Sequence, residues 1–119
     1  MEERARELQN ILDALETMGI PWAYMTFRSK TYIDSDGQEH EVKPPFAVYY
    51  GSGQNKLSAD NTHYWSENTY TIEYYFTDKN STNEEGIETA ILSEGFQFEK
   101  SEDIYLEDED VIVIYYYLN

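Results

Sequence analysis

The first part of the chain carries apolar side chains at the spacing that is typical of an amphipathic helix. Five of them fall on one stripe within residues 2–18: Leu8, Ile11, Leu12, Leu15 and Met18. Gly19 then provides an end signal, and Pro21 prevents the helix from resuming. The polar face is rich in glutamate rather than in basic residues, which argues against a helix lying on a membrane surface. We therefore predict a helix that packs on the rest of the domain.

A second helix is predicted at residues 83–93, where apolar side chains again recur at helical spacing. Gly95 follows as a residue that suits a helix end. The possible N-caps are Ser81, Thr82 and Asn83. Acidic residues in the first turn suit the positive end of the helix dipole.

Much of the remaining chain alternates apolar and polar positions with a period of two, which predicts β-strands with one buried face. The clearest case is the end of residues 63–76, where Tyr70, Ile72, Tyr74 and Phe76 share one face. The expected strands are residues 22–27, 31–33, 39–42, 46–50, 63–76, 96–106 and 111–118.

The last of these strands, residues 111–118, has apolar side chains on both faces. Such a strand needs cover on both sides. Helices can cover one face. The other face can be covered by a subunit partner, by the N-terminal helix, or by the hairpin around residues 31–42. The sequence leaves these alternatives open.

Together these elements predict a single α+β domain over residues 1–119. We expect an antiparallel sheet of about four to five strands, with two helices packed on one face and an extra β-hairpin. The hairpin is predicted because Asp36-Gly37 is a strong turn signal between two short strands. A calcium loop is the alternative, but the EF-hand spacing fails, since Glu39 and Pro45 stand where Gly and Glu are required.

The amino-acid composition excludes several kinds of catalytic site, and no sequence motif indicates another. The chain has no cysteine, which excludes disulfides, thiolate nucleophiles and zinc–thiolate sites. His40 and His63 are the two histidines, and no nucleophile–base motif accompanies them. The run Gly51-Ser52-Gly53 lacks the Lys-Ser/Thr pair of a phosphate-binding loop. We therefore expect no enzyme activity, no cofactor and no metal site.

Charge is the strongest compositional signal. Eight Lys and Arg face 24 Asp and Glu, for a net charge of −16, and most of the acidity lies in the second half of the chain. Such a surface should repel nucleic acid and anionic lipid, so neither a specific nucleic-acid complex nor a membrane is expected as a partner. The acidic run is Glu107, Asp108, Glu109 and Asp110. It is interpreted as a solvated turn, with a negative contact surface or the wall of a channel as the functional alternative.

Several short sequence motifs follow one another in a particular order along almost the whole chain. They are Gly19-Ile20-Pro21, Pro44-Pro45-Phe46, Ala59-Asp60-Asn61, Tyr70-x-Ile72-Glu73-x-Tyr75-x-Thr77-Asp78-Lys79, Gly95-Phe96 and Glu99-Lys100-Ser101-Glu102. In this order they resemble the small head–tail joining or tail terminator (tail completion) proteins of long-tailed phages and prophages of Gram-positive bacteria. Residues 29–42 are longer than that family leads us to expect.

The resemblance implies a structural virion protein that is made in the bacterial cytoplasm and resides in the neck of the virion. Such proteins form a ring, usually a hexamer, that caps the tail tube and docks to the neck. The implied partners are further copies of the chain, the major tail tube protein, a neck or stopper protein, and genomic DNA that passes through without specific binding. The candidate subunit contacts are Tyr74, Tyr75, Tyr115, Tyr116 and Tyr117, since tyrosine is enriched at protein interfaces. The candidate channel-facing acids are Glu107, Asp108, Glu109 and Asp110.

Two alternatives come from other classes of protein. An acidic DNA-mimic inhibitor, of the anti-restriction type, would use the same charge to occupy a basic groove. Its carboxylates should be spaced like phosphates along an exposed face, whereas these cluster in turns and at helix ends. Another neck component, such as a stopper or adaptor, fits the sequence nearly as well as a terminator. A small enzyme is disfavoured by the missing catalytic signature.

Overall fold

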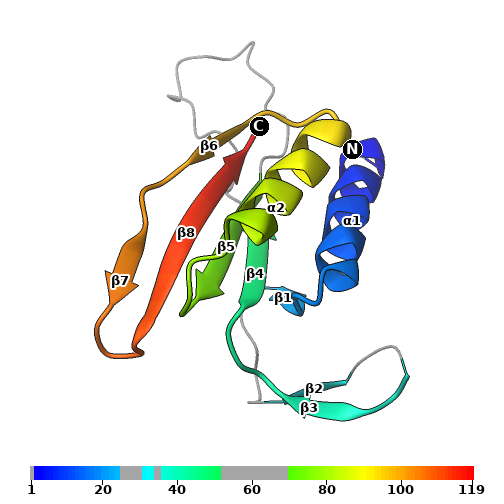
Figure 1. The fold of residues 1–119 in the computed structure, drawn as a ribbon. Helices are drawn as coiled ribbons and strands as arrows, with labels where there is room; N and C mark the ends of the chain where they lie inside the picture. Colours follow the sequence, from blue (N-terminus) through cyan, green and yellow to red (C-terminus); the bar gives the residue numbers. More distant parts are fainter. Residues whose placement is uncertain (1, 25–30, 34–35, 52–69) are drawn as a thin grey trace, which may run out of the picture.

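The computed structural model describes residues 2–24, 31–33, 36–51 and 70–119, and it shows an α+β fold (Figure 1). The helices are α1 (Glu2–Thr17) and α2 (Ser81–Ser93). The strands are β1 (Trp22–Tyr24), β2 (Thr31–Ile33), β3 (Glu39–Glu41), β4 (Phe46–Gly51), β5 (Tyr70–Phe76), β6 (Phe98–Lys100), β7 (Ile104–Leu106) and β8 (Val111–Leu118). Residues 25–27 and 63–69 of the predicted strands lie outside the described residues.

Six strands form one sheet in the order β1-β4-β5-β8-β6, and β7 also pairs with β8. The pairs among β4, β5, β6, β7 and β8 are antiparallel, as predicted. The exception is at one edge, where β1 runs parallel to β4. The sheet is therefore mixed, and it has more strands than the sequence indicated.

Both helices pack on the same face of this sheet. Figure 1 shows α2 in front of β5, with β8 on one side of it and α1 on the other, above β1. Four residues of the predicted stripe are buried in α1, with Leu15 and Ile11 fully enclosed, and Met18 is half-buried just beyond the end of the helix. They share one core with Ile87 of α2 and with Ile72 and Ile114 of the sheet. The pattern of the sequence thus places the helices correctly.

The two helices end in the same way. Gly19 and Gly95 adopt positive φ angles of 84° and 88°, a conformation that costs glycine little. The next residue then donates its amide hydrogen back to the last turn, from Ile20 to Leu15 and from Phe96 to Ile91. Both Ile20 and Phe96 are buried, which is the hydrophobic contact expected of a Schellman-type end.

The start of α2 differs from the prediction. The N-cap is Asn80, and its Oδ1 atom accepts a hydrogen bond from the amide of Asn83 at 3.0 Å. The predicted caps Ser81, Thr82 and Asn83 were wrong, since Ser81 already lies within the helix. Several neighbouring residues had suitable side chains, and pattern alone could not choose among them.

The predicted strand at residues 96–106 is interrupted. Three residues separate Lys100 from Ile104, whereas two residues of β8 lie opposite them. The extra residue forms a bulge, in which Ser101 exchanges hydrogen bonds with the backbone of Tyr115. The bulge reverses the alternation, so that Lys100 points toward the helices and Ile104 toward the other face. A strict period of two predicts the same face for both.

The hairpin at β2 and β3 has the predicted pairing, with Thr31 opposite Glu41 and Ile33 opposite Glu39. It forms a separate two-stranded sheet. Figure 1 shows it beyond the end of the main sheet, away from β8. Asp34 and Ser35 lie outside the described residues, so the calcium-loop alternative is not tested there. Within the described ranges, no helix combines the length and apolar character that crossing a membrane requires.

Candidate functional site

The five tyrosines predicted to contact other subunits lie on two different faces of the sheet. Tyr74 and Tyr116 point toward the helices, and both are fully buried in the core. The Tyr74 hydroxyl accepts a hydrogen bond from Asn83 at 3.2 Å, and the Tyr116 hydroxyl donates one to Glu88 at 3.0 Å. Neither side chain has surface left for a neighbouring subunit. The prediction is corrected for these two residues, which are core residues.

The other three tyrosines lie on the face that is opposite the helices. We call this the open face and define it by its large side chains, Tyr50, Glu73, Tyr75, Tyr115 and Tyr117. Tyr115 and Tyr117 stack with ring centroids 6.1 Å apart. Tyr117 is 45% exposed, while Tyr75 and Tyr115 are half-buried. The open face thus keeps the tyrosines that remain available for contact.

Small side chains on the open face are nevertheless buried. Thr71 stands between Tyr50 and Tyr117 in the register, and Val113 stands between Tyr75 and Ile104. Large neighbours on both sides of a small residue shield it from water. Helix α1, which was one candidate to cover the second face of the last strand, lies on the helix-covered face instead. That alternative is wrong.

Glu73 lies at the centre of the open face. It sits on β5 between Val48 of β4 and Tyr115 of β8. The Tyr50 hydroxyl donates to its Oε2 at 2.9 Å, and the Tyr75 hydroxyl donates to its Oε1 at 2.5 Å. Each carboxylate oxygen therefore receives one phenol. We call these four residues, Tyr50, Glu73, Tyr75 and Tyr115, the Glu73 cluster.

The carboxylate makes these phenols harder to ionise. Burial, followed by the hydrogen bond to Glu73 and its charge, raises the pKa of Tyr50 to about 12. The same causes in the same order raise the pKa of Tyr75 further. Burial and the charge of Glu73 also raise the pKa of Tyr115. The three phenols of the cluster therefore stay neutral near neutral pH.

No lysine or arginine of the described residues forms an ion pair with Glu73. Its charge is supported by hydroxyl dipoles alone. A carboxylate keeps further acceptor capacity after two such bonds, because each oxygen has two lone pairs. The arrangement can accept a cation that approaches from outside the sheet.

The predicted channel acids form the tight turn between β7 and β8, and all four are exposed. Asp110 has a positive φ of 55°, and its side chain accepts a hydrogen bond from Tyr105 at 2.7 Å. The turn joins the paired residues Leu106 and Val111, and Val111 is two residues from Val113, which pairs with Tyr75 of the open face. The charge of Glu109 also contributes to the raised pKa of Tyr75. Acidic turn and aromatic face therefore adjoin at one end of the sheet.

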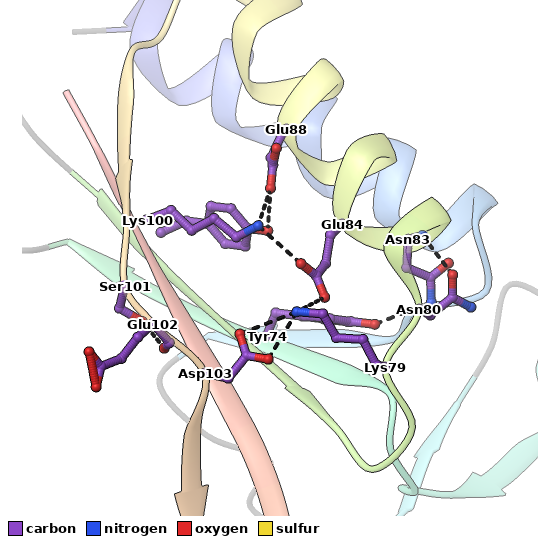
Figure 2. Close-up of polar contacts among 11 residues, drawn as sticks. Tyr74, Lys79, Asn80, Asn83, Glu84, Glu88, Lys100, Ser101, Glu102 and Asp103 are labelled. Atoms are coloured by element: carbon purple, nitrogen blue, oxygen red, sulfur yellow. Dashed lines mark hydrogen bonds and ion pairs between the residues drawn. The ribbon is translucent and has the colours of Figure 1, made fainter.

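The helix-covered face contains another carboxylate, Glu84, and this one is buried (Figure 2). Glu84, in the first turn of α2, is only 5% exposed. Its Oε1 accepts a hydrogen bond from Lys100 at 3.0 Å. Its Oε2 lies 2.9 Å from Nζ of Lys79, close enough for an ion pair but without hydrogen-bond alignment. Lys79 also pairs with Asp103, and Lys100 with Glu88.

These contacts keep both lysines charged. Glu84, and then Asp103, raise the pKa of Lys79. Burial lowers the pKa of Lys100, but Glu88 and Glu84 more than offset this, so the net shift is upward. Lys79 and Lys100 are the two basic residues after position 60 in the sequence. Both therefore serve to join α2 to the sheet, and the acidic turn receives neither of them.

Sequence analysis did not single out Glu73 or Glu84 as site residues. A signal existed for Glu73, which is an acidic residue within an aromatic strand and has tyrosine at position 75 on the same face. Glu84 gave no such signal, because glutamate is common in the first turn of any helix. The geometry of Lys79 and Lys100 depends on contacts between distant segments, which local pattern does not encode.

Comparison of the chain with models of known protein families finds no match. Comparison with curated proteins finds no significant similarity. Within the described part of the chain, no three acidic or histidine side chains gather as a metal site would require.

Proposed function

We propose that the chain is a structural virion protein, a tail terminator or head–tail joining protein. In this role, copies assemble as a ring, usually a hexamer, that caps the tail tube and docks to the neck. The observation that carries the proposal is the position of the acidic turn beside the aromatic open face. A ring subunit needs a lateral contact surface, and next to it a surface that faces the channel.

The open face suits the lateral contact. Tyrosine supplies large contact area at low entropic cost, and its hydroxyl remains satisfied in a partly wet interface. Tyr117, the most exposed of the three candidate tyrosines on this face, is accessible to a neighbouring molecule. Tyr115 stacks beside it, and Tyr75 lies further along the same face, where it donates a hydrogen bond to Glu73.

The acidic turn suits a channel through which DNA passes. DNA carries about one charge per 1.7 Å of its axis, so a basic lining would hold it in place. An acidic lining repels the phosphates and lets the DNA slide. Six copies at −16 each would carry −96 in total. Neither base of the second half of the chain neutralises the turn, since both pair with Glu84.

Negative-stain microscopy of a lysate from a phage or prophage that lacks this gene tests the proposal. We expect DNA-filled heads beside unjoined tails, with some tails longer than normal. Unjoined tails of normal length beside filled heads would instead indicate another neck component, such as a stopper. Normal joined virions would rule out both roles.

The DNA-mimic function remains the second candidate, because the second half of the chain has fourteen acids and its two bases are engaged at Glu84. The exposed acids at the β7–β8 turn could then occupy a basic groove. Tight, salt-sensitive binding to a nuclease, combined with normal virions from the deletion lysate, would favour this function over the terminator.

A further inference from the structure

We infer that the Glu73 cluster binds a basic side chain of helix α1 from a second copy of this chain, with Arg6 as the residue that enters it. This inference rests on the proposed function, since it assigns the lateral contact of the ring to two particular surfaces. It also gives that contact a polarity, because the two surfaces are different.

The chemistry of the cluster selects a cation. A carboxylate accepts charge-assisted hydrogen bonds from a guanidinium or an ammonium group. The tyrosine rings beside it can attract the same cation through their π faces. Arginine suits such a site best, because its planar group both stacks on rings and forms two hydrogen bonds. The neutral phenols do not compete for the positive charge.

Among the bases whose side chains the structure describes, one remains as a source of the cation. Lys79 and Lys100 are already paired with Glu84. The other bases whose side chains the structure describes are Arg6 and Lys43. Lys43 lies 3.9 Å from Glu41, and both belong to the segment next to the hairpin. Arg6 is exposed on α1, and no ion pair forms between it and the described acids.

Arg6 cannot reach Glu73 within the same molecule. The buried stripe of α1 faces the sheet, and Arg6 lies outside that stripe on the exposed side of the helix. The open face is on the far side of the sheet, so the whole sheet and α1 separate the two groups. A contact between them must join two copies.

The contact is head-to-tail, since a face of one copy meets a different face of the next. Contacts of this kind produce rings when the rotation closes, and filaments when it does not. A two-fold dimer would instead place open face against open face, with two Glu73 carboxylates near one another. The head-to-tail arrangement avoids this repulsion and pairs Glu73 with Arg6, although the exposed side of α1 also carries acids such as Asp13 and Glu16.

The net charge of the chain does not prevent this contact. At physiological salt the Debye length is about 8 Å, so repulsion between distant acids of two copies is largely screened. A partly buried pair between Arg6 and Glu73 is screened much less. Tyr and Arg are also the residues that most often carry the binding energy of an interface.

Cross-linking tests the geometry directly, because the chain has no cysteine of its own. We would prepare the full chain with Arg6→Cys and Tyr117→Cys together, and treat concentrated protein with a short bis-maleimide. We expect a ladder of dimers, trimers and larger species up to a closed ring. Each single variant should give dimers at most, in low yield.

The matched control replaces Tyr117→Cys by Tyr105→Cys. Tyr105 is also an exposed tyrosine, at 57%, but it lies on the edge strand and pairs with Ile112, which faces the helices. We expect no ladder from Arg6→Cys with Tyr105→Cys. A ladder of equal strength from this control would overturn the assignment to the open face.

A charge exchange tests the ion pair. Arg6→Glu and Glu73→Lys should each weaken self-association by roughly 10- to 100-fold, the scale of a hydrogen bond to a charged group. The combination should restore most of the loss. Arg6 is on an exposed helix face, so Arg6→Glu remains informative even if Glu73→Lys impairs folding, which circular dichroism would reveal.

The outcomes separate this inference from the proposed function. An oligomer whose copies do not cross-link from Arg6→Cys to Tyr117→Cys overturns the inference, and so does a chain that stays monomeric in concentrated solution. Either result leaves the deletion-lysate experiment to decide on the terminator role. Normal virions in that lysate, together with a clear cross-linking ladder, would support the contact between copies and rule out the terminator role.

Discussion

Neighbouring residues on the two faces of the sheet differ in their burial and in their hydrogen-bond and ion-pair partners. Tyr74 and Tyr75 are adjacent on β5, yet Tyr74 is fully enclosed by the core while Tyr75 is half-buried on the open face. Each face also carries a carboxylate. On the helix-covered face Glu84 receives two lysines, whereas Glu73 on the open face receives two phenols.

We interpret this difference as a division between a carboxylate that stabilises the fold and one that is available for contact with another molecule. Leaving a buried carboxylate without a partner costs several kcal/mol, so the fold places Lys79 and Lys100 at Glu84. Glu73 is half-buried, and hydroxyl groups suffice to support it. One face is complete within the molecule. On the open face no described base forms an ion pair with Glu73, which supports the contact proposed for this surface.

The largest expected effect contrasts Tyr74→Ala with Tyr75→Ala. Removing a fully buried aromatic ring should lower the free energy of unfolding by about 3–5 kcal/mol. Removing the half-buried ring of Tyr75 should cost about 1–2 kcal/mol, since less area and one hydrogen bond are lost. Urea unfolding of the two variants measures this difference. Equal losses would mean that both faces are equally covered, against the account given above.

The second contrast concerns the two carboxylates. Glu84→Gln keeps the shape of the side chain but removes the charge that holds two lysines, and should cost about 1–3 kcal/mol. After Glu73→Gln the side chain can still accept a hydrogen bond from one phenol, and no lysine loses its partner. The free energy of unfolding should therefore fall by less than about 1 kcal/mol. Denaturant midpoints decide the order. A larger loss for Glu73→Gln would show that Glu73 serves the fold of the single chain.

A third contrast uses alkaline pH. The folded-state pKa values of Tyr50, Tyr75 and Tyr116 are raised, so the folded state favours their neutral form. Their contribution to stability is complete below pH 10 and is lost as pH rises from there toward the raised values. The raised pKa values of Lys79 and Lys100 act in the same direction above pH 10.5. Stability should therefore fall steeply above about pH 10.

The ultraviolet absorbance of tyrosinate resolves the two faces within this titration. Glu73→Gln removes the hydrogen-bonding charge beside Tyr50 and Tyr75, so both should ionise at lower pH than in the unaltered chain. Tyr116, whose pKa is raised by burial and by Glu88, should not change. A titration curve that Glu73→Gln leaves unaltered would argue against the Glu73 cluster.

The smallest effect is expected at the acidic turn. Glu107→Gln with Asp108→Asn removes two exposed charges that form no ion pair with the described bases, so stability should change by less than about 0.5 kcal/mol. Thermal unfolding measures this, with Asp110 left in place because Tyr105 binds it. A large loss of stability would mean that these acids maintain the fold rather than a channel surface.

Local pattern predicted the elements of this fold well. The stripe of α1, the glycine ends of both helices and the alternation within β5 each follow from rules that apply to a single segment. The α+β class followed from their order. The N-cap Asn80 was missed because the residues next to it are equally good caps. The bulge at Ser101 was missed because no residue type in this segment signals an extra residue in the strand.

The candidate site was predicted less well, because it depends on which face each strand presents. Alternation in β5 already separates Tyr74 from Tyr75, but both faces of β8 are apolar, and only the position of the helices separates Tyr116 from Tyr117. Likewise, the partners of Glu84 come from the turn after β5 and from β6, which local rules do not bring together. Contacts between distant segments therefore set the limit of the sequence analysis.

The central claim is that the open face makes a contact on which function depends, and that the exposed side of α2 does not. The most direct test is to complement the deletion phage or prophage with plasmid-borne variants of the gene and examine the lysate by negative-stain microscopy. Tyr117→Ala and Leu92→Ala each remove an exposed apolar side chain, the first from the open face and the second from α2. We predict that Leu92→Ala restores joined virions and that Tyr117→Ala, although folded, does not. Full restoration by Tyr117→Ala would contradict the account.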